Sequence, residues 1–220
     1  MKKKIYIALV IDTSESLEKK GDIINNALKE MITAIKTCPE LWGCDIYFTL
    51  VTFTNNMYHD IVCCPINKVD ESTLTLRFRG QTNPAPALRF AIGDAIAKTQ
   101  DWALHSEECF YPLVFFMTDG VPYPKEYDDD YMNAVKEFRS NIYNSQKKKN
   151  VCTVIGAGYG EADMDKIRML AGDFTVRIKD NDSSLAAFFK EIVPKTIVEF
   201  STNGIDALTR NFDRNISGIV

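Results

Sequence analysis

Hydrophobic residues follow two different spacings along the chain, and the alternation between them predicts an α/β fold. Apolar runs of strand length recur at residues 5–11, 46–53, 112–117, 151–155 and 174–178. Helical patterns with one apolar face separate most of these runs. Strands that alternate with helices in this way are expected to pair in parallel, with the helices packed on the sheet.

The predicted helices are marked by apolar residues spaced three and four positions apart. The clearest pattern follows Pro86 and comprises Leu88, Ala91, Ile92, Ala95 and Ile96. Similar spacings recur over residues 24–35 and 185–192. Residues at these spacings share one face of an α-helix, so each helix is expected to bury that face against the sheet.

One stretch, YFTLVTFTNNMYHDIV, departs from the alternation of strand and helix. It holds two strand-like runs with Asn55 and Asn56 between them. Asparagine tolerates the positive φ angles of a two-residue hairpin turn, so we predict an antiparallel hairpin here. The sheet is therefore expected to be mixed, with about six strands, mostly parallel, and the second hairpin strand at an edge.

The length and composition are sufficient for one hydrophobic core, because 45% of the 220 residues are hydrophobic. Residues 1–200 are expected to form this domain. Residues 201–220 have weak periodicity, and we expect them to form a C-terminal extension packed on the same domain.

The charge and the apolar runs exclude several classes of function. A net charge of −4 provides no basic surface for nucleic-acid phosphates. The run at residues 5–11 is too short for a secretion signal, and no other run approaches the roughly 20 residues of a membrane helix. The six cysteines have neither the paired spacing of zinc sites nor the density of a disulfide framework. We therefore predict a cytoplasmic protein with reduced thiols that binds neither nucleic acid nor membranes.

Polar side chains that could bind a ligand collect in three predicted loops. Asp12, Ser14 and Ser16 follow the first strand, Thr82 precedes a helix, and Asp119 ends another strand. The carboxyl ends of parallel strands meet at one edge of a sheet, where α/β proteins commonly bind ligands. We therefore expect these five side chains to lie together.

Carboxylate and hydroxyl oxygens are the ligands that Mg²⁺, Mn²⁺ and Ca²⁺ prefer. Mg²⁺, which retains several waters, suits a site with only two carboxylates, and Mn²⁺ or Ca²⁺ are the alternatives. Two negative charges would leave the ion electrophilic, so an acidic residue from another protein could fill an open coordination position. Each loop also has a structural interpretation. The first-loop residues could cap a helix, Thr82 or Asn83 could be an ordinary N-cap, and Asp119 could belong to a simple turn. The three loops taken together favour the metal site.

The motif D-x-S-x-S at residues 12–16, Thr82 and T-D-G at residues 118–120 together resemble a von Willebrand factor A (VWA) domain. The resemblance extends over about residues 5–196, and VIGAGYGEADMDKIRMLAG is similar to a strand and helix of that family. In the family, the three elements form the metal-ion-dependent adhesion site (MIDAS). The compact chain is most similar to the bacterial TerY-like, tellurium-resistance group.

This resemblance implies a doubly wound, Rossmann-like three-layer sandwich and a protein-interaction function rather than an enzyme. It implies that Asp12, Ser14 and Ser16 are ligands from the first loop, with Thr82 and Asp119 binding the ion directly or through water. It also implies a role in a bacterial stress or tellurite-resistance system.

The second loop departs from the family pattern. Many members have two glycines before the loop threonine, where this chain has Gly80 and Gln81. The shape of this loop is therefore left open.

An alternative function is Mg²⁺-dependent phosphoryl transfer with Asp12 as the nucleophile. Enzymes of that kind have a second Asp two positions later as acid/base, and this chain has Ser14 there. Nucleotide binding by GAGYG, residues 156–160, is disfavoured because Glu161 stands where G-x-G-x-x-G requires its third glycine. These glycines are instead expected to form a tight turn between a strand and a helix.

Overall fold

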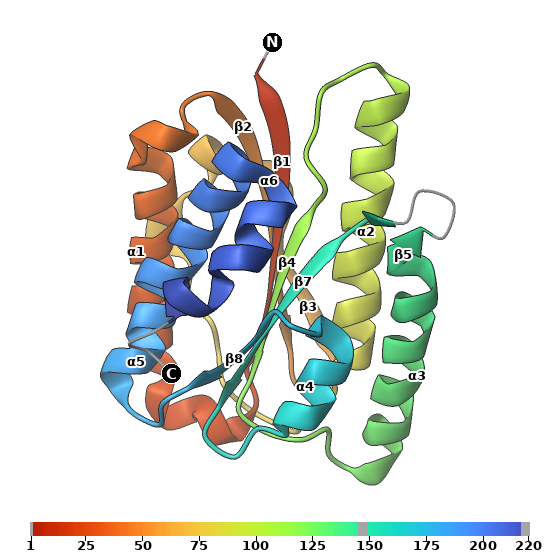
Figure 1. The fold of residues 1–220 in the computed structure, drawn as a ribbon. Coiled ribbons are helices and arrows are strands. Elements are labelled where there is room, and N and C mark those ends of the chain that lie inside the picture. Colours follow the sequence, from red (N-terminus) through yellow and green to blue (C-terminus); the bar gives the residue numbers. More distant parts are fainter. Residues whose placement is uncertain (1, 145–148, 217–220) are drawn as a thin grey trace.

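A computed structural model describes residues 2–144 and 149–216 of the chain. A central sheet lies between two layers of helices, so the molecule has three layers (Figure 1). The strands and helices follow in chain order as β1 (Lys3–Asp12), α1 (Gly21–Thr37), β2 (Cys44–Phe53), β3 (Met57–Pro65), α2 (Ala85–Leu104), β4 (Leu113–Thr118), α3 (Lys125–Ile142), β5 (Tyr143–Asn144), β6 (Lys149–Asn150), β7 (Thr153–Tyr159), α4 (Met164–Ala171), β8 (Thr175–Ile178), α5 (Asp182–Ala187), a π-helical turn (Phe188–Ile192) and α6 (Val193–Ile216).

The six strands of the main sheet have the order β3-β2-β1-β4-β7-β8. Strand β1 pairs in parallel with both β2 and β4, and β7 pairs in parallel with β4 and β8. Strand β3 at the edge pairs antiparallel with β2. The predicted doubly wound α/β fold, with a mostly parallel sheet and one antiparallel edge strand, is therefore confirmed.

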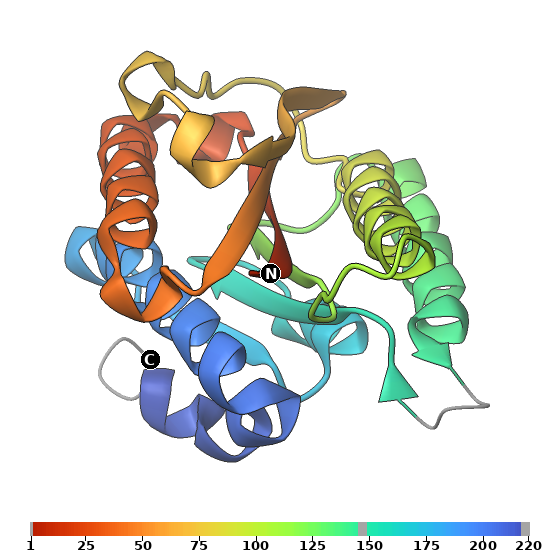
Figure 2. The same cartoon turned by 90° about the horizontal axis from the view of Figure 1, so that it is seen from above.

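Both faces of the sheet are covered by helices, which explains the continuous apolar runs of the central strands. The odd-numbered residues of β1 from Ile5 to Ile11 pack in one core cluster with apolar residues of α1 and α6. The even-numbered residues from Tyr6 to Val10 pack in a second cluster with α2 and α3. Figure 2 shows these two pairs of helices on opposite sides of the sheet. A strand buried on both faces needs apolar residues at every position.

The hairpin turn between β2 and β3 differs from the predicted two-residue turn. Three residues, 54–56, separate the strands, and neither Asn55 nor Asn56 has a positive φ angle. The N–H of Thr54 donates to the carbonyl of Asn56 at 2.9 Å, so this longer turn closes without the positive φ angles that a two-residue turn requires.

The glycines of GAGYG were expected in a turn, and this prediction is wrong for two of them. Gly156 and Gly158 lie inside β7, and only Gly160, with φ of +59°, follows the strand. A Cβ atom on Gly156 would lie 2.4 Å from Cγ2 of Ile167 in α4. The missing side chains therefore allow α4 to pack directly on the strand.

Helix α6 continues the chain beyond residue 200 and contains a break at Gly204, where φ is +72°. Phe212 is buried and packs edge-on against Phe174, with ring centroids 5.1 Å apart. Residues 217–220 of the predicted C-terminal extension lie outside the described residues, and the division at residue 200 stays a prediction. Within the described part of the chain, no helix is both long enough and apolar enough to span a membrane.

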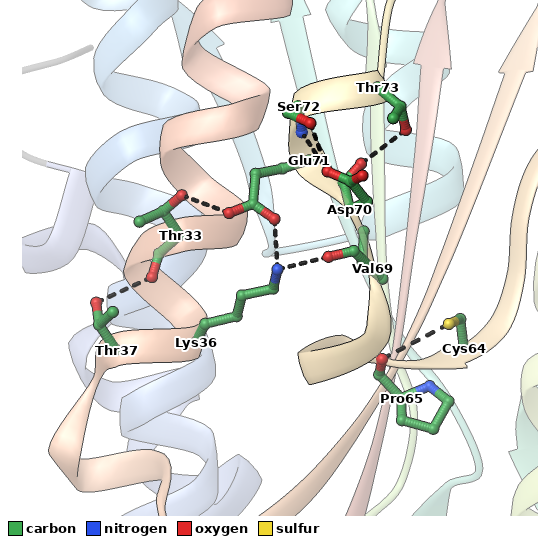
Figure 3. A network of polar contacts seen from close by, with 10 residues as sticks. All are labelled: Thr33, Lys36, Thr37, Cys64, Pro65, Val69, Asp70, Glu71, Ser72 and Thr73. Atoms are coloured by element: carbon green, nitrogen blue, oxygen red, sulfur yellow. Dashed lines mark hydrogen bonds and ion pairs between the residues drawn. The ribbon is translucent and has the colours of Figure 1, made fainter.

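Residues 66–84, here called the connecting segment, join β3 to α2 and run along α1. Figure 3 shows one end of this segment, where Nζ of Lys36 donates to the Val69 carbonyl at 2.5 Å and pairs with the Glu71 carboxylate. Nearer its other end, the Asn25 side chain accepts from the Leu76 N–H at 2.7 Å and donates to its carbonyl at 3.2 Å. Helix α1 therefore holds the segment that leads to Thr82.

Candidate metal-binding site

The predicted site lies at the carboxyl-terminal edge of the sheet. Asp12 is the last residue of β1, and Asp119 directly follows β4. Because β1 and β4 are neighbouring parallel strands, both carboxylates emerge at the same edge.

Asp12 forms the buried floor of the site. Its side chain is fully buried, and Oδ1 accepts a hydrogen bond from the N–H of Ser14 at 2.9 Å. Its Oδ2 accepts a hydrogen bond from the hydroxyl of Thr118 at 2.6 Å. Thr118 was not predicted as a site residue. Thr118 is the last residue of β4, next to Asp119, and this position could have marked it as a site residue.

A chain of oxygen atoms leads from the floor to the surface. The Ser14 and Ser16 hydroxyl oxygens are 3.0 Å apart, and Ser16 Oγ donates to Asp119 Oδ1 at 3.0 Å. Ser14 is buried, Asp119 is half-buried, and Ser16 is exposed. The site therefore opens to solvent at its Ser16 end.

Thr82 is paired with the loop that follows β4. Its carbonyl accepts from the N–H of Tyr123 at 3.0 Å, and its hydroxyl oxygen would lie 3.9 Å from a Cβ placed on Gly120. Thr82 is buried. The structure therefore brings the three predicted loops together.

The capping interpretation of these hydroxyl groups is wrong. Ser14 precedes a short 3₁₀ helix, Glu15–Lys20, but its side chain makes no capping hydrogen bond. The N-cap of α2 is Pro84 rather than Thr82. These hydroxyl groups are therefore not used to cap a helix.

Gly80 and Gln81 fix the shape of the second loop. Gly80 has φ of +77°, and a Cβ there would lie 2.2 Å from Oδ1 of Asn55. That oxygen accepts from the Gln81 N–H at 2.9 Å, and the Asn55 amide donates to Oε1 of Gln81 at 2.9 Å. Gln81 thus ties this loop to the hairpin turn. The loop also touches the first loop directly, since the Gly80 carbonyl accepts from the N–H of Glu15 at 3.1 Å.

The two carboxylates lie in surroundings that disfavour their charged forms. Burial raises the pKa of Asp12 to about 7, and the nearby charge of Asp119 adds to this effect. The hydrogen bond from Thr118 acts in the opposite direction and lowers the pKa. Burial also raises the pKa of Asp119. Among the described residues, no ion pair involves either carboxylate. A cation between them would remove this electrostatic cost.

The donor atoms fit a hard divalent ion. No group of three or more His, Cys, Asp or Glu side chains within residues 2–144 and 149–216 is arranged to hold a metal. The predicted set instead combines two carboxylates with hydroxyl oxygens, which suit Mg²⁺ better than softer metals. Adjacent ligands of octahedral Mg²⁺, each about 2.1 Å from the ion, lie about 3.0 Å apart. The spacings from Ser14 to Ser16 and from Ser16 to Asp119 match this value.

Comparison of the sequence with protein-family models finds no match, and no curated protein matches it. Solved structures do match its fold. Proximal thread matrix protein 1 from the mussel byssus superposes with a TM-score of 0.63 and 14% identity over 91% of this chain. The pilus adhesin SpaC from Lactobacillus rhamnosus GG superposes with a TM-score of 0.66 and 15% identity over 90% of this chain. The chain has a von Willebrand factor A-like fold.

The VWA-like fold accounts for most of this chain but for less of the matched proteins. The chain covers 48% of proximal thread matrix protein 1 and 30% of SpaC. A further structure of the mussel protein, with a TM-score of 0.55 and 15% identity over 88% of this chain and 46% of that one, has a zinc-occupied MIDAS motif. At these identities the likeness shows the fold alone.

Proposed function

We propose that the chain is a metal-ion-dependent protein-interaction module. Asp12, Ser14, Ser16, Thr82 and Asp119 would hold Mg²⁺, or alternatively Mn²⁺ or Ca²⁺, directly or through water. The observation that carries the proposal is the pair of carboxylates, Asp12 and Asp119, at one sheet edge. The Ser14 N–H bonds to Asp12, and the Ser14 and Ser16 hydroxyls lead from there to Asp119.

The proposed ion ligands include a buried residue, Asp12, and residues at the solvent-exposed rim, Ser16 and Asp119. A carboxylate offers about four lone-pair positions, so Asp12 keeps acceptor capacity beyond its bonds to Ser14 and Thr118. Ser16 and Asp119 lie where solvent reaches the site. When bound, the ion would supply an electrophilic position for a partner carboxylate. The exposed rim gives that partner its access.

The comparisons support this function in general terms. The zinc-occupied MIDAS motif of proximal thread matrix protein 1 supports a divalent ion in a VWA-like fold, and the pilus adhesin supports a protein partner. The TerY-like grouping and the role in stress or tellurite resistance stay predictions without such support. Cytoplasmic location is likewise a prediction, and the six free cysteines are consistent with it.

The structure gives no support to the phosphoryl-transfer alternative. The nucleophile would be Asp12, whose side chain is fully buried. An attacking carboxylate must reach the phosphorus atom. We therefore retain the non-enzymatic function.

Thermal unfolding with and without Mg²⁺ tests the proposal. An ion that binds only the folded state stabilises it by about 2.7 kcal/mol at one hundred times its Kd. We expect millimolar Mg²⁺ to raise the melting temperature relative to EDTA, and Asp119→Asn to remove most of this rise. Asp129→Asn, at an exposed position of α3, is the matched control and should keep it. The proposal fails if no shift occurs, or if Asp119→Asn leaves the shift intact.

A further inference from the structure

Exposed side chains of two kinds flank the proposed ion site. Arg79, in the connecting segment, is exposed on one side. On the other side, after β4, lie Val121 and Tyr123, which are 43% and 62% exposed. Tyrosine is enriched at protein interfaces, so this side of the site offers a contact for a partner.

The backbone fixes Arg79 beside the first loop. Its N–H donates to the carbonyl of Thr13 at 2.8 Å, and Thr13 lies between Asp12 and Ser14. The Arg79 side chain lies close enough to Tyr58 of β3 to lower the pKa of that phenol. Among the described residues, no carboxylate forms an ion pair with Arg79. Arg79, whose backbone is fixed beside the first loop and whose side chain is exposed, is therefore available to an external anion.

The backbone also fixes Tyr123. Its N–H bonds to the Thr82 carbonyl in an isolated antiparallel bridge. Its side chain nevertheless stays mostly in solvent. Tyrosine on a fixed backbone binds partners at a low cost in conformational entropy.

The order of the strands places the ion site between these two features. Arg79 contacts Tyr58 on edge strand β3, whereas Val121 and Tyr123 follow β4. Strand β1, which ends at Asp12, lies between β2 and β4 in the sheet. A partner segment that reaches the ion would therefore meet a cation toward β3 and an apolar surface toward β4.

We propose that the partner is a protein segment with two acidic side chains and an apolar one. One carboxylate would complete the ion site, the second would pair with Arg79, and the apolar side chain would cover Val121 and Tyr123. This inference rests on the proposed metal-dependent function and adds the chemistry of the partner. Arginine suits the second carboxylate because its planar group binds two carboxylate oxygens at once.

A displayed library of random short peptides tests the inference. The library is selected on the full chain in millimolar Mg²⁺, and bound peptides are released with EDTA. We expect the released peptides to be enriched in two acidic residues together with an aromatic or aliphatic residue. On Arg79→Gln the preference for the second acid should disappear, and a selected peptide should bind about tenfold more weakly, as expected for one lost charged hydrogen bond. Arg79→Lys should restore part of the preference.

Matched variants separate recognition from folding. Arg77→Gln removes another exposed arginine of the connecting segment and should leave the enrichment unchanged. Tyr123→Ser should remove the apolar preference, whereas Tyr111→Ser, before β4 at the opposite sheet edge, should not. The melting temperature of each variant shows whether it is folded.

The results also separate this inference from the proposed function. If Mg²⁺ stabilises the protein but the released peptides carry a single acid, or none is enriched, the inference fails and the metal site stands. It fails equally if Arg79→Gln keeps the preference for two acids. If Mg²⁺ produces no stabilisation, the proposed function fails first.

Discussion

Ser16 and Asp119 are 103 positions apart in the sequence, yet the Ser16 hydroxyl donates to the Asp119 carboxylate at 3.0 Å. This bond joins the loop after β1 to the loop after β4. It crosses the opening of the site, where Ser16 is exposed and Asp119 is half-buried. The two residues therefore define where an ion and its partner would enter.

Ser16→Ala should weaken Mg²⁺ binding by about tenfold while leaving the metal-free protein nearly as stable. The lost oxygen is a proposed ion ligand, whereas its hydrogen bond is exposed and contributes at most about 0.5 kcal/mol to folding. Calorimetric titration with Mg²⁺ measures the first effect, and urea unfolding in EDTA measures the second. Ser140→Ala, at an exposed position of α3, is the control. Equal Mg²⁺ affinity in the two variants would exclude Ser16 as a ligand.

The metal-free protein should lose stability between about pH 5 and about pH 8. The folded state raises the pKa of Asp12 to about 7 from an ordinary value of 3.8, so it favours the protonated carboxyl. That contribution is complete below the ordinary pKa and is lost as the pH rises through about 7. Melting temperatures measured in EDTA across this range give the slope.

Asp12→Asn should flatten the dependence of stability on pH, because the amide does not titrate in this range. Millimolar Mg²⁺ should reverse the loss of stability at the alkaline end, since the ion favours the charged carboxylate. A metal-free protein whose melting temperature rises from about pH 5 to about pH 8 would contradict the electrostatic account of the site.

Gly80→Ala should destabilise the protein by about 1–3 kcal/mol and weaken ion binding. The substitution forces a side chain into a positive φ conformation, 2.2 Å from the Asn55 amide that holds Gln81. Gly93→Ala provides a contrast, because a Cβ at this exposed helical position meets no other atom within 4 Å. It should stabilise the protein by up to about 1 kcal/mol. Urea unfolding of both variants checks the pair, and a neutral Gly80→Ala would show that the loop does not require this conformation.

Asn25→Ala should destabilise the protein by about 1–3 kcal/mol, because the N–H and carbonyl of Leu76 both lose their partner. Asn26→Ala in the same helix removes an exposed side chain and should change the stability little. Hydrogen exchange at the Leu76 amide should increase in the first variant alone. Unchanged protection there would mean that α1 does not hold the connecting segment.

The strands were most predictable where helices cover both faces of the sheet. The apolar run of β1 is continuous because its alternate residues enter two different core clusters. Strand β7 was predicted at residues 151–155 but occupies Thr153–Tyr159. The prediction stopped before Gly156 because Gly156 and Gly158 have low strand propensity. Their presence in the strand follows from the close approach of α4, which the local sequence does not report.

The candidate site was predictable only in part for a similar reason. Asp12 and Asp119 were recognised because each ends an apolar run. The bond from Thr118 to Asp12 joins residues 106 positions apart, and the pairing of Asn55 with Gln81 spans 26 positions. Such contacts depend on the completed sheet, so no spacing within a single segment predicts them.

The loops that converge on Asp12 also set an order of events during synthesis of the chain. Asp12 leaves the ribosome before its neighbour Thr118, which follows 106 positions later, and before the facing Asp119. A nascent chain that ends before β4 therefore lacks part of the proposed ion site. An ion could assist folding only after β4 has paired with β1. A bound ion would thus stabilise the folded domain but would not assist the first steps of its folding.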